Sequence, residues 1–256
     1  SEKMFEKINH PFMNAIEQKV LKKATVLLPI SSYTKKLCDE GLGFERDAVR
    51  VTPVPVEARG YEKSFLSGSL RVIAVGRFTD PRKNLNMLLN VCEKLLGTDA
   101  RFCVDIVGVY PRNHPDVIRL SVKFASRIIF HGFTEQKVLD ELYRGAFVSV
   151  ITSDQEGLGI VGLDALSWGI PVITTRCGGV VDYVKPGVSG FLVEPHDVCE
   201  MVESIKVLAN NPGLYFALSA GALRLVRTCF SKESVFIRFQ WALSQAYPEL
   251  ATLFTN

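Results

Sequence analysis

The chain has 256 residues, of which 47% are hydrophobic and 22% charged, and its formal net charge is +3. This balance is typical of a globular protein, and the small, scattered positive charge argues against a nucleic-acid-binding surface. Residues 1–13 lack the apolar stretch of a signal peptide, and no segment approaches the roughly 20 apolar residues of a membrane span. We therefore expect a soluble, cytoplasmic protein, while peripheral contact with a membrane stays open.

The six cysteines occur at wide, irregular intervals without a C-x-x-C pair, and the chain has only four histidines. Zinc-binding proteins use closely spaced ligand pairs, which are missing here. Cys92 and Cys103 lie within apolar runs, where buried thiols are common. We predict reduced, structural cysteines and no metal site or cofactor.

Residues 1–57 have a mixed pattern. We predict helices over Ala15–Lys23 and from Ser31 or Ser32 to Gly41, and strands over Thr25–Ile30 and Ala48–Thr52, before Pro53-Val54-Pro55 ends the pattern. Two short strands and two helices cannot bury a core of their own. This part is therefore predicted to be a linker and the tail of a second, incomplete Rossmann-like domain.

From residue 70 onward, short apolar runs alternate with amphipathic ones. The predicted strands are Leu70–Val75, Phe102–Val107, Ile128–His131, Phe147–Ile151, Val172–Thr174 and Phe191–Val193. The predicted helices are Asn84–Leu96, Pro115–Phe124, Glu135–Arg144, Ile160–Trp168 and Val198–Asn210, with Thr134 and Asp197 as N-caps. This alternation predicts an α/β domain with a doubly wound parallel sheet over residues 58–230.

Two more helices are predicted after the break at residues 210–213, over Leu214–Thr228 and Lys232–Ala246. We assign residues 231–256 to a third part, whose helix packs back toward the N-terminal domain.

The loop after the first of these strands, Val75-Gly76-Arg77-Phe78-Thr79-Asp80-Pro81-Arg82-Lys83-Asn84, is a candidate ligand site. Ligands of such sheets bind beyond the carboxyl ends of the strands. With a helix starting near Arg82, two cations would lie in a first turn, where the helix dipole disfavours them unless an anion binds. Arg77 and Lys83 could clamp a diphosphate. The alternative is an ordinary solvated basic loop.

A second candidate lies in Glu156-Gly157-Leu158-Gly159-Ile160-Val161-Gly162-Leu163-Asp164. Glycines there would let a ligand approach the backbone, and the first-turn N–H groups favour a phosphate. Glu156 precedes the helix and Asp164 lies about 12 Å further along its axis, roughly 80° around it, so both could border one groove. The alternative is a capping carboxylate and a surface aspartate. Further on, Gly178-Gly179 would either admit a ligand or simply form a turn.

Together, GRFTDPRKN, EGLGIVGLDALSWGIPVITTRCGGVVDYV and GVSGFLVEPHD resemble the group 1 (family 4) glycosyltransferases of the GT-B fold, over about residues 15–247. The resemblance implies a retaining transfer from a nucleotide-diphosphate-sugar, with this chain as the C-terminal, donor-binding half. It implies that Glu156, the proposed catalytic residue, contacts the donor sugar and that Asp164 contacts the ribose. The implied donor-binding residues are Arg77, Lys83, Glu156, Gly157, Leu158, Gly159, Asp164, His131, Gly132 and Phe133, with the last three at the base.

Some features depart from that family. Asp164 replaces its usual glutamate, the linker Asn-Gly-Val-Asp is absent, and no histidine matches its catalytic one. The implied partners are a nucleotide-sugar donor and an unidentified acceptor, and a second chain would complete the N-terminal domain. The competing hypothesis is a non-catalytic nucleotide-sugar-binding subunit or fragment. An epimerase or phosphorylase of the same fold would need acid–base carboxylates or a pyridoxal lysine, for which we find no motif.

Overall fold

The computed structural model describes residues 19–21, 23–42, 50–60 and 69–249. The chain divides into two compact units, one formed by residues 1–53 with 233–256 and the other by residues 54–232.

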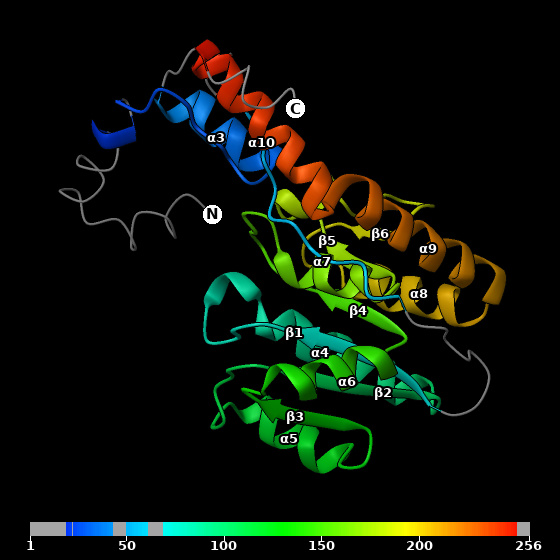
Figure 1. The fold of residues 1–256 in the computed structure, drawn as a ribbon. Coiled ribbons are helices and arrows are strands. Elements are labelled where there is room, and N and C mark those ends of the chain that lie inside the picture. Colours follow the sequence, from blue (N-terminus) through cyan, green and yellow to red (C-terminus); the bar gives the residue numbers. More distant parts are fainter. Residues whose placement is uncertain (1–18, 22, 43–49, 61–68, 250–256) are drawn as a thin grey trace. The chain divides into compact units, whose positions relative to one another are not determined.

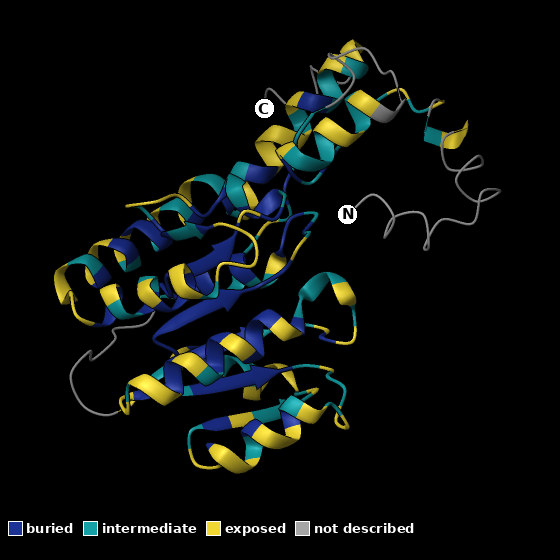
Figure 2. Ribbon diagram, turned by 180° about the vertical axis from the view of Figure 1, so that it is seen from behind, coloured by how far each residue is buried: buried dark blue, intermediate teal, exposed yellow. Residues whose placement is uncertain are grey.

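The larger unit contains a six-stranded parallel sheet (Figure 1). Its strands are β1 (Leu70–Val75), β2 (Phe102–Val107), β3 (Ile128–Gly132), β4 (Val148–Ile151), β5 (Val172–Thr175) and β6 (Gly190–Val193). Every strand predicted from residue 70 onward is confirmed to within one residue at each end. Continuous apolar runs form these strands because the sheet is buried on both faces, as its colouring in Figure 2 shows.

The strand order is β3-β2-β1-β4-β5-β6, so the chain builds outward from β1 to β3 and then returns to place β4 beside β1. This reversal is a topological switch point, the place where open α/β sheets bind their ligands. The predicted doubly wound α/β fold is therefore confirmed, and the two candidate loops both lie at its switch point.

Helices cover both faces of the sheet. The helices of this unit are α4 (Leu85–Thr98), α5 (Pro115–Lys123), α6 (Gln136–Gly145), α7 (Ile160–Ser167), α8 (Val198–Ala209) and α9 (Pro212–Leu225), the last continued by the π-helical turn η4 (Val226–Phe230). Helices α4, α5 and α8 share one apolar core with alternate strand residues such as Val72 and Val104, while α7 packs against β4 and β5 from the other side. Asp197 caps α8 as predicted, but α6 is preceded by Glu135 and not by Thr134 as its N-cap.

The smaller unit contains α3 (Ser32–Leu42) and α10 (Lys232–Ala246). The Ser31 hydroxyl accepts a hydrogen bond from the Thr34 amide at 3.0 Å, which explains the start of α3. The predicted helix over Ala15–Lys23 lies partly outside the described residues, and its described residues 19–21 are helical.

The two strands predicted in this unit do not form in the described residues. Residues 25–30 and 50–52 run alongside each other and share only two backbone hydrogen bonds, Arg50 to Leu27 and Thr52 to Pro29. Pro29 and Pro53 have no N–H group, so they cannot continue a ladder. The apolar pattern of these segments was right, but the strand prediction was wrong; residues 48 and 49 lie outside the described part.

Candidate functional site

The loop after β1 folds into a single 3₁₀ turn, η2 (Pro81–Lys83), before α4 begins at Leu85. Asp80 caps this turn, and Asn84 adopts a left-handed conformation (φ 48°) while its side chain accepts from the Met87 amide to cap α4. The prediction that the helix starts near Arg82 was therefore wrong by three residues. The cations precede the first turn of α4, and the expected conflict with its dipole does not arise.

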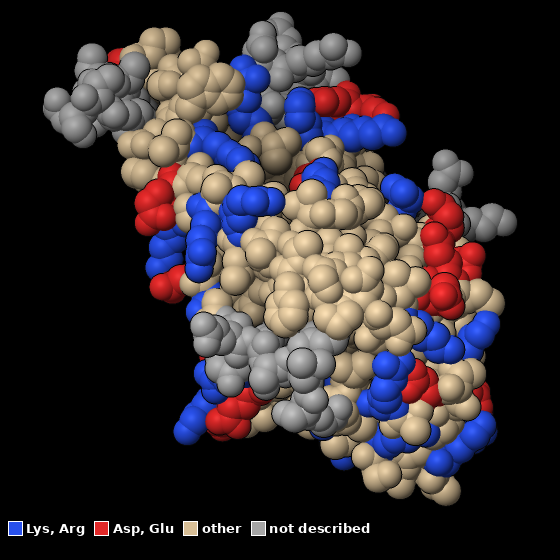
Figure 3. All heavy atoms as spheres, turned by 90° about the vertical axis from the view of Figure 1, so that its right-hand side faces the viewer, with Lys and Arg blue, Asp and Glu red and all other residues tan. Residues whose placement is uncertain are grey.

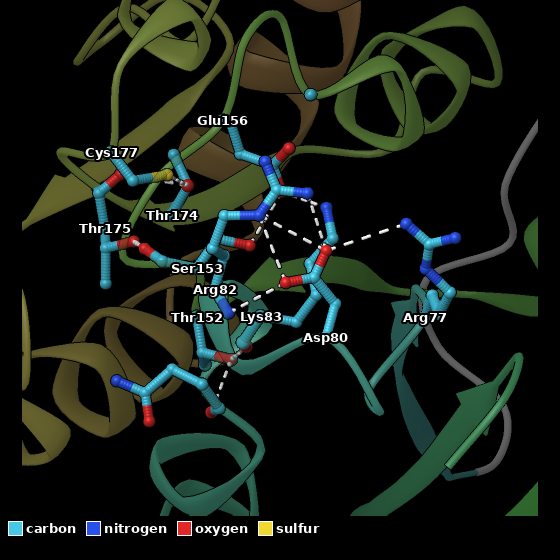
Figure 4. A network of polar contacts seen from close by, with 12 residues as sticks. Arg77, Asp80, Arg82, Lys83, Thr152, Ser153, Glu156, Thr174, Thr175 and Cys177 are labelled. Atoms are coloured by element: carbon cyan, nitrogen blue, oxygen red, sulfur yellow. Dashed lines mark hydrogen bonds and ion pairs between the residues drawn. The ribbon is translucent and has the colours of Figure 1, made fainter. Parts of the chain in front are cut away.

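The cations of this loop are held by carboxylates (Figure 4). The Arg82 guanidinium forms three hydrogen bonds to Asp80, the shortest at 2.6 Å, and it lowers the pKa of Asp80 to about 2. Arg77 is exposed and approaches the same carboxylate at 3.6 Å. Asp80 was not predicted to belong to the site. In the sequence it stands out only as an aspartate before Pro81, a pair that is typical of a turn.

Lys83 and Glu156, which are 73 positions apart in the sequence, form an ion pair with Nζ and Oε1 2.6 Å apart. Glu156 is 8% exposed, and the Ser153 hydroxyl donates to the same oxygen at 2.7 Å. The structure thus brings these two predicted site residues together, while Arg77 lies on the far side of Asp80 in Figure 4.

Further hydrogen bonds join the loop after β4 to the loop after β1. The Asp154 amide donates to the Arg82 carbonyl at 2.8 Å, and the Asn84 amide group donates to the Asp154 carboxylate at 2.8 Å. The Thr152 hydroxyl donates to the Lys83 carbonyl at 3.1 Å. Because these bonds hold the two loops together, they bring the backbones of Lys83 and Glu156 close enough for their side chains to meet.

The loop after β5 is joined to Glu156 by backbone hydrogen bonds. The Glu156 amide donates to the Cys177 carbonyl at 2.6 Å, and the Gly179 amide donates to the Glu156 carbonyl at 3.0 Å. A Cβ atom on Gly179 would lie 2.1 Å from the Gly157 carbonyl oxygen. Gly179 therefore lets two loop backbones pack against each other, and it opens a 3₁₀ turn over Gly179–Asp182. A ligand contact of the paired glycines stays a prediction.

Helix α7 begins directly after this loop. Its N-cap, Gly159, has φ 75° and offers no side-chain cap, so the first-turn N–H groups depend on other partners. The side chain of Leu158 is buried at 2% exposure, which leaves only backbone groups of residues 157–159 for the predicted ligand contact.

Asp164, on α7, is half-buried. Burial raises the pKa of its carboxyl, and the charge of Arg59 partly counters this effect. Asp164 is therefore not the surface aspartate of the alternative interpretation. A hollow of about 380 Å³ opens beside the β1 loop, lined by residues that include Phe78, Asn84 and His114, and it contains neither Glu156 nor Asp164. The single groove expected to join those two carboxylates stays a prediction.

His131 turns its imidazole into the sheet. Its Nε2 atom lies 2.7 Å from the Asp105 carboxylate, which is 1% exposed and also accepts two hydrogen bonds of 2.7 Å from Arg71. Gly132 has φ 69°, and Phe133 is 87% exposed. The predicted contact with a base would thus fall to the backbone and to Phe133. The Arg71–Asp105–His131 cluster, centred on the buried Asp105, was not anticipated from the sequence, since Asp105 lies in an otherwise apolar strand.

Within the described ranges, no group of three or more histidine, cysteine or acidic side chains could hold a metal ion. None of the helices in that part of the chain is long and apolar enough to cross a membrane. In the face shown in Figure 3, basic and acidic side chains lie next to each other around the margins, and the centre is uncharged.

The doubly wound parallel sheet, with a lysine–glutamate pair and a glycine-capped helix at its switch point, defines a Rossmann-like α/β protein. Residues 69–211 match the family model of the group 1 glycosyl transferases. The chain belongs to this family of transferase enzymes.

Relatives support this assignment over most of the chain. D-inositol 3-phosphate glycosyltransferase of Acidothermus cellulolyticus is 29% identical over 201 residues, which cover 71% of this chain and 44% of that protein. Sulfoquinovosyl transferase SQD2 of Arabidopsis thaliana is 33% identical over 200 residues, covering 72% of this chain and 38% of that protein. The matched segment thus spans less than half of either relative.

Solved structures show the same fold. HepE of Anabaena, in complex with UDP and glucose, has a TM-score of 0.78 at 17% identity, covering 93% of this chain and 68% of its own. TarM of S. aureus, in a complex that contains UDP, has a TM-score of 0.75 at 20% identity, covering 88% of this chain and 44% of its own.

Proposed function

We propose that this chain supplies the donor-binding half of a retaining glycosyltransferase that uses a nucleotide-diphosphate-sugar, with UDP as the nucleotide. The observation that carries the proposal is the Lys83–Glu156 pair at the switch point, where a cation for the diphosphate meets a carboxylate for the sugar. UDP is proposed because the solved complexes of HepE and TarM contain it.

The proposed diphosphate ligands are Lys83, Arg77 and the N-terminus of α7. Lys83 would exchange its contact with Glu156 for the phosphate oxygens, and the exposed Arg77 side chain can reach a ligand without breaking a short ion pair. These groups would neutralise the charge that develops on the leaving diphosphate, so that no metal ion is needed.

Glu156 is the proposed catalytic residue. Released from Lys83, its carboxylate would accept hydrogen bonds from sugar hydroxyls and hold the anomeric carbon toward the acceptor. The acceptor hydroxyl would attack from the face that the diphosphate leaves, with the sugar–phosphate bond breaking as the new glycosidic bond forms. The proton of the attacking hydroxyl would pass to the departing phosphate, which gives retention of configuration.

Asp164 is proposed to bind the ribose, and the segment His131, Gly132 and Phe133 to hold the base. Because the pKa of Asp164 is raised by burial, hydrogen bonds from two ribose hydroxyls would stabilise its charged form. We place the reaction in the cytoplasm, with peripheral membrane contact as an open possibility, and we propose no cofactor beyond the donor itself.

The second candidate function is a nucleotide-sugar-binding subunit or fragment that needs another chain for transfer. Apolar side chains exposed on α10, namely Phe236, Ile237 and Trp241, at 54%, 64% and 50%, favour a covering domain. That domain would also supply the acceptor site.

Two experiments test the proposal. Calorimetric titration of the chain with UDP-, GDP- and ADP-sugars should give one saturable site for the UDP compounds, and a donor at 100 times its Kd should stabilise the fold by about 2.7 kcal/mol. In a protein that also carries an acceptor domain, Glu156→Ala and Lys83→Ala should each strongly lower transfer. Unchanged turnover in both variants would overturn the assignment.

A further inference from the structure

Tyr183 is a fully buried tyrosine beneath the first turn of α7. It is 0% exposed, and its hydroxyl donates a hydrogen bond of 2.5 Å to the Gly159 carbonyl. Burial raises the pKa of this phenol well above its ordinary value, so it stays a hydrogen-bond donor. None of the roles proposed above uses this group.

The glycines of α7 leave room for the phenol. A Cβ atom on Gly162 would lie 2.3 Å from the Tyr183 hydroxyl oxygen, and one on Gly159 would lie 2.9 Å from it and 2.7 Å from Val180. Their lack of side chains is therefore explained by Tyr183 and its neighbour, without an approaching ligand.

Tyr183 also ends a segment that supports Glu156. This segment, Cys177–Tyr183, includes the 3₁₀ turn η3 (Gly179–Asp182). Its first residues exchange two backbone hydrogen bonds with Glu156, and its last residue bonds to Gly159. The loop Glu156–Gly159 is thus held at both ends by one short stretch of chain.

We propose that Tyr183 is a positioning residue, whose hydroxyl fixes the first turn of α7 at the distance from Glu156 that a sugar-bearing phosphate requires. Gly159 has no side chain to cap the helix and a backbone conformation that few other residues adopt, so an external hydrogen bond sets its orientation. The proposal rests on the proposed function, because it assumes a diphosphate at this turn.

The test compares UDP with UMP, which lacks the second phosphate, by calorimetric titration of the 256-residue chain. Tyr183→Phe should weaken UDP binding about five- to tenfold, the loss of one neutral hydrogen bond, and change UMP binding by less than about twofold. The matched control is Tyr215→Phe, another buried tyrosine of the same unit at 1% exposure, and it should leave both affinities unchanged. A general loosening of the fold would lower both affinities alike, and that result would overturn the proposal.

Gly162→Ala is the second variant, and it decides the matter if Tyr183→Phe does not fold. Its methyl group displaces the Tyr183 hydroxyl, so the ratio of UDP to UMP affinity should again fall, and adding Tyr183→Phe should cause no further loss. An unchanged ratio in a natively folded Gly162→Ala protein would contradict the positioning role. If the unmodified chain binds neither nucleotide, the proposed function fails as well. If it binds UDP and both variants bind it equally, only the role of Tyr183 is refuted.

Discussion

Replacing Lys83 with methionine should destabilise the larger unit and show how much the ion pair with Glu156 contributes to the free energy of unfolding. The pair is close, at 2.6 Å, and largely removed from water, with side-chain exposures of 22% for Lys83 and 9% for Glu156. Breaking a fully buried pair costs about 3–5 kcal/mol, whereas an exposed pair contributes about 0–1 kcal/mol. For this intermediate burial we expect Lys83→Met to lower the free energy of unfolding by about 2 kcal/mol. The buried Glu156 carboxylate would lose its cation and keep the hydrogen bond from the Ser153 hydroxyl.

The assay is urea unfolding of four proteins: the unmodified chain, Lys83→Met, Glu156→Gln and the double variant. The double variant should be more stable than the sum of the single effects predicts, by about 1–2 kcal/mol, since it leaves no unpaired buried charge. Heating should show a loss of about 4–8 °C for Lys83→Met. Additive effects, or a fully stable Lys83→Met protein, would refute the inference that the two side chains form a stabilising ion pair.

Three further predictions concern neighbouring residues. Asp164→Asn should raise the melting temperature at pH 7, because burial raises the pKa of this carboxyl and its charge opposes folding there. The same variant should bind nucleotide more weakly. A fall in both the melting temperature and the nucleotide affinity would contradict this account. Asp80 has a folded pKa of about 2 against an ordinary value of 3.8, so its pairing with Arg82 stabilises the fold above about pH 4 and is lost as the pH falls toward 2. Asp80→Asn should remove about 1–2 kcal/mol of that acid-dependent stability, as acid titration of both proteins would show. Gly179→Ala should cost at least about 2 kcal/mol in urea unfolding, because its Cβ atom would lie 2.1 Å from the Gly157 carbonyl oxygen, and a neutral effect would mean that the two loops are further apart.

Much of the fold could be predicted because the sheet is buried on both faces. Runs such as Leu70–Val75 and Phe102–Val107 are apolar except for one charged residue each, and a helix separates each strand from the next, which leaves few other topologies. The strand predictions for residues 25–30 and 48–52 were wrong because an apolar run also occurs in extended segments that do not join a sheet. A proline, which lacks the N–H group that a ladder needs, favours the extended segment.

The site was predicted in part, because only some of its contacts have a local signal. Glu156 and Lys83 stood out through their positions after strands, but their direct pairing depends on β1 and β4 being neighbours in the sheet. Asp80 and Tyr183 could not be singled out. Asp80 bonds to Arg82 because a local turn brings them together. Tyr183 bonds to Gly159, which lies 24 residues away in the sequence.

The central claim is that the Lys83–Glu156 pair marks the binding site of a nucleotide-diphosphate-sugar. Calorimetric titration of UDP-glucose into the chain and into Lys83→Ala tests it most directly, with Lys123→Ala as the control, a lysine paired with Glu93 on the surface. We expect one binding site in the unmodified chain and in the control, and a loss of at least tenfold in affinity for Lys83→Ala. Equal affinity in all three proteins, or no binding of any UDP-, GDP- or ADP-sugar to the unmodified chain, would contradict the claim.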